Sequence, residues 1–117
     1  MTKGILVNED KIYQLADIAA AAQTQIQNAF SNLDPVVNIS RAMRKSGFPA
    51  DTMTIECLTS KKRILFIYHD DQPQQLKLQY GYSDQDPGEE YIYVSLEEFT
   101  QDNIVNWIKA YFLKDSD

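Results

Sequence analysis

The sequence predicts a single α+β domain with two layers, in which a four-stranded antiparallel meander is covered by helices in the order ααββββα. Three observations carry this prediction: helical apolar spacing near both ends of the chain, alternating apolar residues between 52 and 96, and short polar breaks between the alternating runs. Short connections favour antiparallel neighbours, and helices then form the second layer. At 117 residues the chain is long enough for one domain only.

The first predicted helix covers residues 10–33 and is the longest element. Its apolar residues follow steps of three and four, which is a heptad stripe, and no charged residue occurs between Ile18 and Leu33. Either the helix packs along its own domain, or it self-associates as a helical hairpin or coiled coil. We expect the stripe to make self-contacts in a homodimer, and its candidate interaction residues are Ile12, Leu15, Ala19, Ala22 and Ile26.

A short second helix is predicted over residues 35–46. Asp34 is a suitable N-cap and Pro35 suits the first helical position. The end of this helix is marked more clearly, because Arg44 and Lys45 favour the last turn and Gly47 can adopt the left-handed conformation that follows it.

The predicted sheet spans residues 52–96. Its centre is a hairpin from Arg63 to Tyr82 with the turn at residues 70–74, and the first strand of this hairpin is apolar on both faces. Such a strand indicates that a second layer or a partner covers the other face of the sheet. The last helix, residues 100–113, has a broad apolar stripe that we expect to pack on the sheet: Ile104, Val105, Trp107, Ile108, Tyr111 and Phe112.

Tyrosine is enriched in the predicted strands. If Ile92 and Val94 face the helices, Tyr91 and Tyr93 face the opposite side of the sheet. One interpretation is that these rings only cover a half-buried face, since tyrosine suits strands. The other is that they form a platform for a partner, since rigid amphipathic rings are favoured at interfaces. We take Tyr91 and Tyr93 as candidate interaction residues.

The chain is poorly equipped for catalysis. The single histidine lies in His69-Asp70-Asp71, where a polar trio before a turn is ordinary hairpin chemistry. The run with Asp84, Asp86 and Glu89 has acidic spacing that does not match a calcium loop, and whether it binds a cation stays open. The single cysteine, Cys57, fits a core position. We expect no enzyme activity, no cofactor and no metal.

Charge and hydropathy restrict the partners. The net charge is −6, which disfavours nucleic acid and anionic membranes, although six of the eleven cations lie between Arg41 and Arg63. No run of 18 apolar residues predicts a transmembrane helix, and a single cysteine fits a reducing compartment, so we expect a cytoplasmic protein.

The hypothesis that follows is a non-enzymatic protein–protein interaction module, a small acidic adaptor or chaperone-like protein that forms a homodimer. No motif of a known family is present, but size, acidity and element order resemble the architecture of bacterial secretion chaperones and immunity-type adaptors. The alternative is a small-molecule or peptide-binding domain with a pocket between the first helix and the sheet.

Overall fold

The computed structural model describes residues 11–31, 33–86 and 88–113. It has one five-stranded antiparallel sheet in the order β1-β2-β3-β4-β5, so the predicted meander is confirmed with one strand more than expected. The elements in chain order are α1 (Lys11–Ala29), β1 (Pro35–Ser40), α2 (Ala42–Lys45), β2 (Ala50–Cys57), β3 (Lys62–His69), β4 (Gln75–Tyr82), β5 (Ile92–Ser95), the 3₁₀ turn η2 (Leu96–Glu98) and α3 (Gln101–Phe112).

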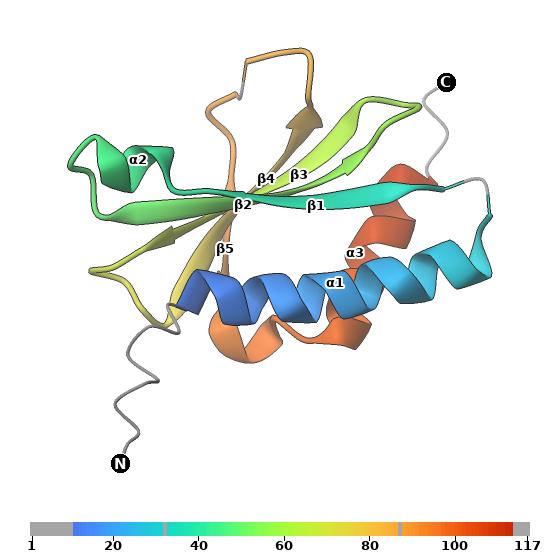
Figure 1. Ribbon diagram of the computed structural model, residues 1–117, viewed down its shortest axis with the longest axis horizontal. Coiled ribbons are helices and arrows are strands. Elements are labelled where there is room, and N and C mark those ends of the chain that lie inside the picture. The colour runs from blue at the N-terminus through green and yellow to red at the C-terminus, as the bar shows by residue number, and fades with distance from the viewer. Residues whose placement is uncertain (1–10, 32, 87, 114–117) are drawn as a thin grey trace.

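The fold has two layers, and α1 and α3 lie on the same face of the sheet (Figure 1). Both long helices were predicted, and α1 ends at Ala29, four residues before the predicted end at residue 33. Residue 10, where the prediction began, lies outside the described residues. Within the part of the chain that the structure describes, none of the helices is long and apolar enough to cross a membrane.

The predicted helix over residues 35–46 is wrong in its first half, because Pro35–Ser40 is strand β1. Each of its residues is in register with β2, from Pro35 opposite Cys57 to Ser40 opposite Thr52. Val36, Val37 and Ile39 are β-branched and favour a strand, and Pro35 stands first on an edge strand, where its missing N–H breaks no ladder. The helix is reduced to α2, a single turn.

The end of α2 follows the predicted signals. Gly47 has φ +91°, in the left-handed region. The Phe48 N–H donates to the Met43 carbonyl at 2.9 Å and the Gly47 N–H donates to the Arg44 carbonyl at 3.0 Å. These two bonds form a Schellman motif, which satisfies carbonyls at the end of the helix.

The two faces of the sheet differ because side chains alternate along each strand. The helix-covered face carries the buried apolar residues Met53, Ile55, Cys57, Ile64, Phe66, Tyr68, Leu76, Leu78 and Val94. The outer face carries Thr52, Thr54, Leu65, Ile67, Lys77, Gln79 and Tyr93, which are in register with one another. Leu65 and Ile67 are only half-buried there. The apolar character of β3 on both faces therefore leaves aliphatic surface on a face that α1 and α3 do not cover.

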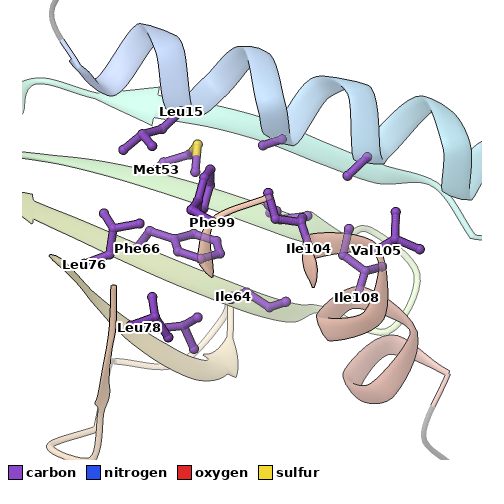
Figure 2. Packing of buried hydrophobic residues seen from close by; sticks show 14 of the residues in the cluster. Leu15, Met53, Ile64, Phe66, Leu76, Leu78, Phe99, Ile104, Val105 and Ile108 are labelled. Atoms are coloured by element: carbon purple, nitrogen blue, oxygen red, sulfur yellow. The ribbon is translucent and has the colours of Figure 1, made fainter. Parts of the chain in front are cut away.

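The stripe of α1 lies in the core of its own domain, which is one of the two arrangements that its spacing suggested. Its side chains are 3% exposed or less: Ile12, Leu15, Ala19, Ala22 and Ile26. Figure 2 shows Leu15 and Met53 facing each other between α1 and the sheet. The two alanines let the helix approach the sheet closely. The apolar spacing that suggested a coiled coil is therefore used to pack α1 on the sheet.

Helix α3 completes the same core. Ile104 and Ile108 are fully buried, and the Phe66 ring packs edge-on against Phe99 with centroids 5.4 Å apart (Figure 2). At the far end of α3, the buried Lys62 side chain donates from Nζ to the Tyr111 carbonyl at 3.0 Å. This cation satisfies a carbonyl at the helix C-terminus, where the dipole favours positive charge.

Because α1 packs closely on the sheet, enlarging the buried Ala22 and enlarging the exposed Ala21 are expected to change stability to different extents. Ala22→Leu adds three carbons at a site with no exposed surface and is expected to lower the free energy of unfolding by about 1–3 kcal/mol. Ala21→Leu, on the exposed side of the same turn, is the control and is expected to change stability by less than about 0.5 kcal/mol. Urea unfolding measures both. Equal stabilities of the two variants would contradict the packing of α1 on the sheet.

Candidate functional site

The candidate site arises because β5 is much shorter than β4. The β4–β5 ladder runs from Gln75 opposite Ser95 to Leu78 opposite Ile92 and stops there. Strand β4 continues to Tyr82 with β3 on its other side only. The second half of β4 is therefore an open edge of the sheet.

A groove of about 500 Å³ lies at this open edge. Its lining residues are Leu78, Tyr80, Glu89, Glu90, Tyr91 and Ile92. Leu78 forms a buried floor, whereas Tyr80 is 44% exposed and Ile92 is 53% exposed. Tyr80 packs on the Tyr111 ring of α3, with centroids 4.9 Å apart, and burial raises the pKa of its phenol. The groove thus combines apolar and aromatic walls with two carboxylates.

The tyrosine pair borders the groove on the side of the outer face. Val94 is buried under the helices and Tyr93 points the opposite way, as predicted. The Tyr91 and Tyr93 rings meet edge to face with centroids 5.4 Å apart, and both remain largely exposed. Lys77 Nζ lies 4.3 Å from the centroid of the Tyr91 ring. A side-chain hydrogen bond with Tyr91 raises the pKa of the Tyr93 phenol.

The side chain of Gln79 fixes the segment that carries the two carboxylates. Its Nε2 donates to the Gly88 carbonyl at 2.7 Å and to the Glu90 carbonyl at 3.0 Å. Both acceptors are backbone groups, so the side chains of Glu89 and Glu90 are not used to hold the segment. Their carboxylates therefore remain at the rim of the groove.

A second hollow, of about 520 Å³, lies at the opposite end of the sheet among Tyr13, Arg41, Arg44 and Lys45. Its arginines are engaged with acidic residues of the same chain. Asp51, which is 2% exposed, accepts from Arg41 Nε at 2.8 Å and from Arg44 Nη2 at 3.0 Å. Arg44 also forms a two-pronged bond with Asp70, at 2.7 and 2.9 Å.

These ion pairs tie α2 to β2 and to the β3–β4 turn. Burial alone would raise the pKa of Asp51, but hydrogen bonds from Arg44 and then Arg41 outweigh it and hold that pKa below its usual range. The hydrogen bond from Arg44 likewise lowers the pKa of Asp70. The two carboxylates thus pair with Arg41 and Arg44, two of the six cations between Arg41 and Arg63.

The other polar clusters considered from the sequence are not brought together as a site. Asp70 is bound to Arg44, whereas His69 packs edge-on against Phe48 with ring centroids 5.6 Å apart. The Cys57 thiol is buried and lies 3.4 Å from the Thr59 hydroxyl. Among residues 11–31, 33–86 and 88–113, no group of three or more histidine, cysteine or acidic side chains is arranged to hold a metal ion.

The sequence therefore points to part of the site and misses the rest. Tyr91 and Tyr93 lie beside the groove, but Tyr80, Glu89, Glu90 and Ile92 were not selected. Their proximity depends on where β5 starts relative to β4, and no periodicity of a single segment contains that register. Comparisons of the chain with protein families, with curated proteins and with solved structures find no match.

The ion-pair cluster predicts acid sensitivity. The pKa of Asp51 is lower in the folded state than its usual value of about 3.9, so the unfolded state binds more protons and stability falls as pH drops below about 4. Asp51→Asn is expected to lower stability at pH 7 by about 3 kcal/mol and to flatten this acid dependence. Urea unfolding between pH 7 and 3 measures both effects.

Asp71→Asn is the matched control, because Asp71 is an exposed aspartate next to Asp70. It is expected to keep the stability and the acid profile of the unchanged protein. An Asp51→Asn variant with the unchanged acid profile would show that the cluster does not contribute to the pH dependence.

Proposed function

We propose that this protein is a non-enzymatic interaction module that binds a segment of a protein partner in the aromatic groove at the open edge of β4. The observation that carries the proposal is the concentration of exposed aromatic and aliphatic side chains there. Of the eight large apolar side chains that are most exposed among the described residues, four lie in or beside the groove: Tyr80, Tyr91, Ile92 and Tyr93. Exposed apolar residues gathered in one place are typical of interaction sites.

The chemistry of the groove specifies the partner segment. Leu78, Tyr80 and Ile92 offer apolar contacts, and Glu89 and Glu90 offer two carboxylates at the rim. No lysine or arginine occurs between Lys77 and Lys109 in the sequence. The matching occupant is a peptide segment in which an apolar side chain stands next to a lysine or arginine. Charge complementarity of this kind favours encounter and orientation.

The space between α1 and the sheet does not support the alternative of a pocket there. The side chains of Ala19, Ala22 and Met53 have no exposed surface, so this layer is filled by the core. Peptide binding is accordingly assigned to the groove at the open edge of β4.

We also propose that the protein forms a homodimer. Because the α1 stripe is used inside the domain, self-association has to involve another surface. The homodimer is supported by the edge strand β1, which carries no charged residue and lies at the opposite edge of the sheet from the groove.

Selection from a displayed library of random linear peptides tests the groove. We expect the enriched peptides to carry an apolar residue beside lysine or arginine and to bind less tightly as salt is raised, because the carboxylates are solvent-exposed. Affinity is measured by fluorescence anisotropy with labelled peptides. Enrichment of acidic peptides, or of none, would rule out the proposed partner chemistry.

Variants then locate the binding surface. Tyr91→Ala combined with Tyr93→Ala, and separately Glu89→Gln combined with Glu90→Gln, are each expected to weaken peptide binding about tenfold or more. Tyr13→Ala is the control, because Tyr13 is an equally exposed tyrosine (41%) that lines the hollow at the opposite end of the sheet. Peptide binding that is reduced by Tyr13→Ala and not by the groove variants would contradict the assignment of the site.

A further inference from the structure

Strand β1 is an edge strand whose outward peptide groups can be identified from the ladder. The Asp70 N–H donates to the Pro49 carbonyl and the Lys61 N–H donates to the Cys57 carbonyl, so odd-numbered residues of β2 bond toward β3. Even-numbered residues of β2 then bond toward β1, since antiparallel ladders alternate. Their partners on β1 are Val36, Asn38 and Ser40. The peptide groups of Val37 and Ile39 therefore point away from the sheet.

These outward groups are not used within the described part of the chain. The Pro35 carbonyl accepts from Gln23 Nε2 of α1 at 2.7 Å, but no hydrogen bond joins the outward peptide groups of Val37 or Ile39 to another described residue. The strand also lacks the devices that normally block an edge: it carries no lysine and no other charge, and its only proline is at the first position. The edge is open to another strand.

Few charged residues lie around this edge. Helix α1 runs along β1 in the opposite direction, since Gln27 bonds to Asp34, Gln23 bonds to Pro35 and Tyr13 bonds to Arg41. From Ile18 to Ser40 the only charged residue is Asp34, although 24% of the chain is charged. In a protein of net charge −6, a strip of this length with a single charge reduces the electrostatic repulsion between two copies.

We propose that two copies pair through β1 in an antiparallel arrangement, which makes one continuous ten-stranded sheet. Val37 of one copy pairs with Ile39 of the other, so the outward groups of both residues form four hydrogen bonds about a two-fold axis. The axis passes between the two Asn38 residues, which face each other as a non-hydrogen-bonded pair. This inference names the surface of the proposed homodimer and rests on that proposal.

The geometry favours a second copy over an unrelated strand. A two-fold interface requires a surface that complements itself, and an uncharged edge with donors and acceptors placed symmetrically about Asn38 meets that requirement. Beside the edge, the neutral Gln23 of α1 bonds to the Pro35 carbonyl, and Asp17 is the one charged residue of α1 between Tyr13 and Gln23.

Val37→Pro tests the interface without removing an intrachain hydrogen bond, because the Val37 N–H points outward. Sedimentation velocity at micromolar concentration is expected to give twice 13.4 kDa for the unchanged protein and 13.4 kDa for Val37→Pro. Circular dichroism and urea unfolding check that the variant is folded. A folded Val37→Pro protein that remains dimeric would overturn the proposal.

A cysteine pair tests the register independently of folding effects. Facing residues at a non-hydrogen-bonded position have Cα atoms about 4.5 Å apart, within the range of a disulfide. Asn38→Cys is expected to cross-link into a dimer under mild oxidation, and native Cys57 does not interfere because it is buried. Ser40→Cys is the matched control on the same exposed side of β1. Its two copies would lie about 13 Å apart, at 3.3 Å per residue, and should not cross-link.

The outcomes separate this inference from the rest of the proposed function. A dimer in which Asn38→Cys does not cross-link would reject pairing through β1 and would leave the homodimer itself standing. A monomer at high micromolar concentration that still binds basic peptides would reject both the β1 interface and the homodimer, and would leave the groove standing. Cross-linking of Asn38→Cys together with loss of the dimer in Val37→Pro would support the β1 pairing.

Discussion

The packing of α1 on the sheet is the contact on which the rest of the structure depends. Its stripe of isoleucine, leucine and alanine has almost no exposed surface, and the two central alanines bring the helix backbone close to β1 and β2. Together with α3, it covers one face of the sheet, and neither of these two long helices covers the other face (Figure 1). The contact therefore uses the apolar surface that a coiled coil would need and decides which surfaces remain for partners.

The two edges of the sheet differ in how far the edge strand pairs with its neighbour. At one edge, β5 pairs with only half of β4, and the remaining half is flanked by a segment that Gln79 holds through its backbone carbonyls. At the other edge, β1 pairs along its whole length with β2 and exposes an uncharged margin. Edge strands left open in this way invite pairing unless charge or proline blocks them. The proposals accordingly assign side-chain contacts with a peptide to the β4–β5 edge and strand pairing to the β1 edge.

The sequence predicts most of the fold because the strongest signals are local. The α1 and α3 stripes, the β3–β4 hairpin and the glycine end of α2 depend on spacing within one segment. Pro35–Ser40 was taken as helix because Asp34-Pro35 resembles a helix start, whereas the β-branched Val36, Val37 and Ile39 find their stability in pairing with β2. Pairing across segments is the information that a local pattern does not contain.

The same limit explains the candidate site. Apolar spacing in α1 identifies a stripe, but it does not say whether the partner of that stripe is the sheet or a second helix. The opposite orientation of Tyr93 relative to Val94 followed from alternation alone. The groove, in contrast, brings Tyr80 together with Glu89 and Glu90 across a loop, and this depends on the register at which β5 joins β4.

The positions of the two proposed surfaces are compatible with simultaneous use. β1 and β5 are opposite edges of the sheet, four strand spacings or about 19 Å apart. Pairing through β1 would join two sheets at their centre and place one groove near each outer edge of a ten-stranded sheet, about 43 Å apart at 4.8 Å per strand. A partner that carries two basic apolar segments, joined by a linker long enough to span that distance, would bind both grooves, and the second contact would be intramolecular. Dimerisation through β1 would then let two grooves that each bind weakly hold one partner with higher avidity. The β1 edge would in this way contribute to binding as well as to assembly.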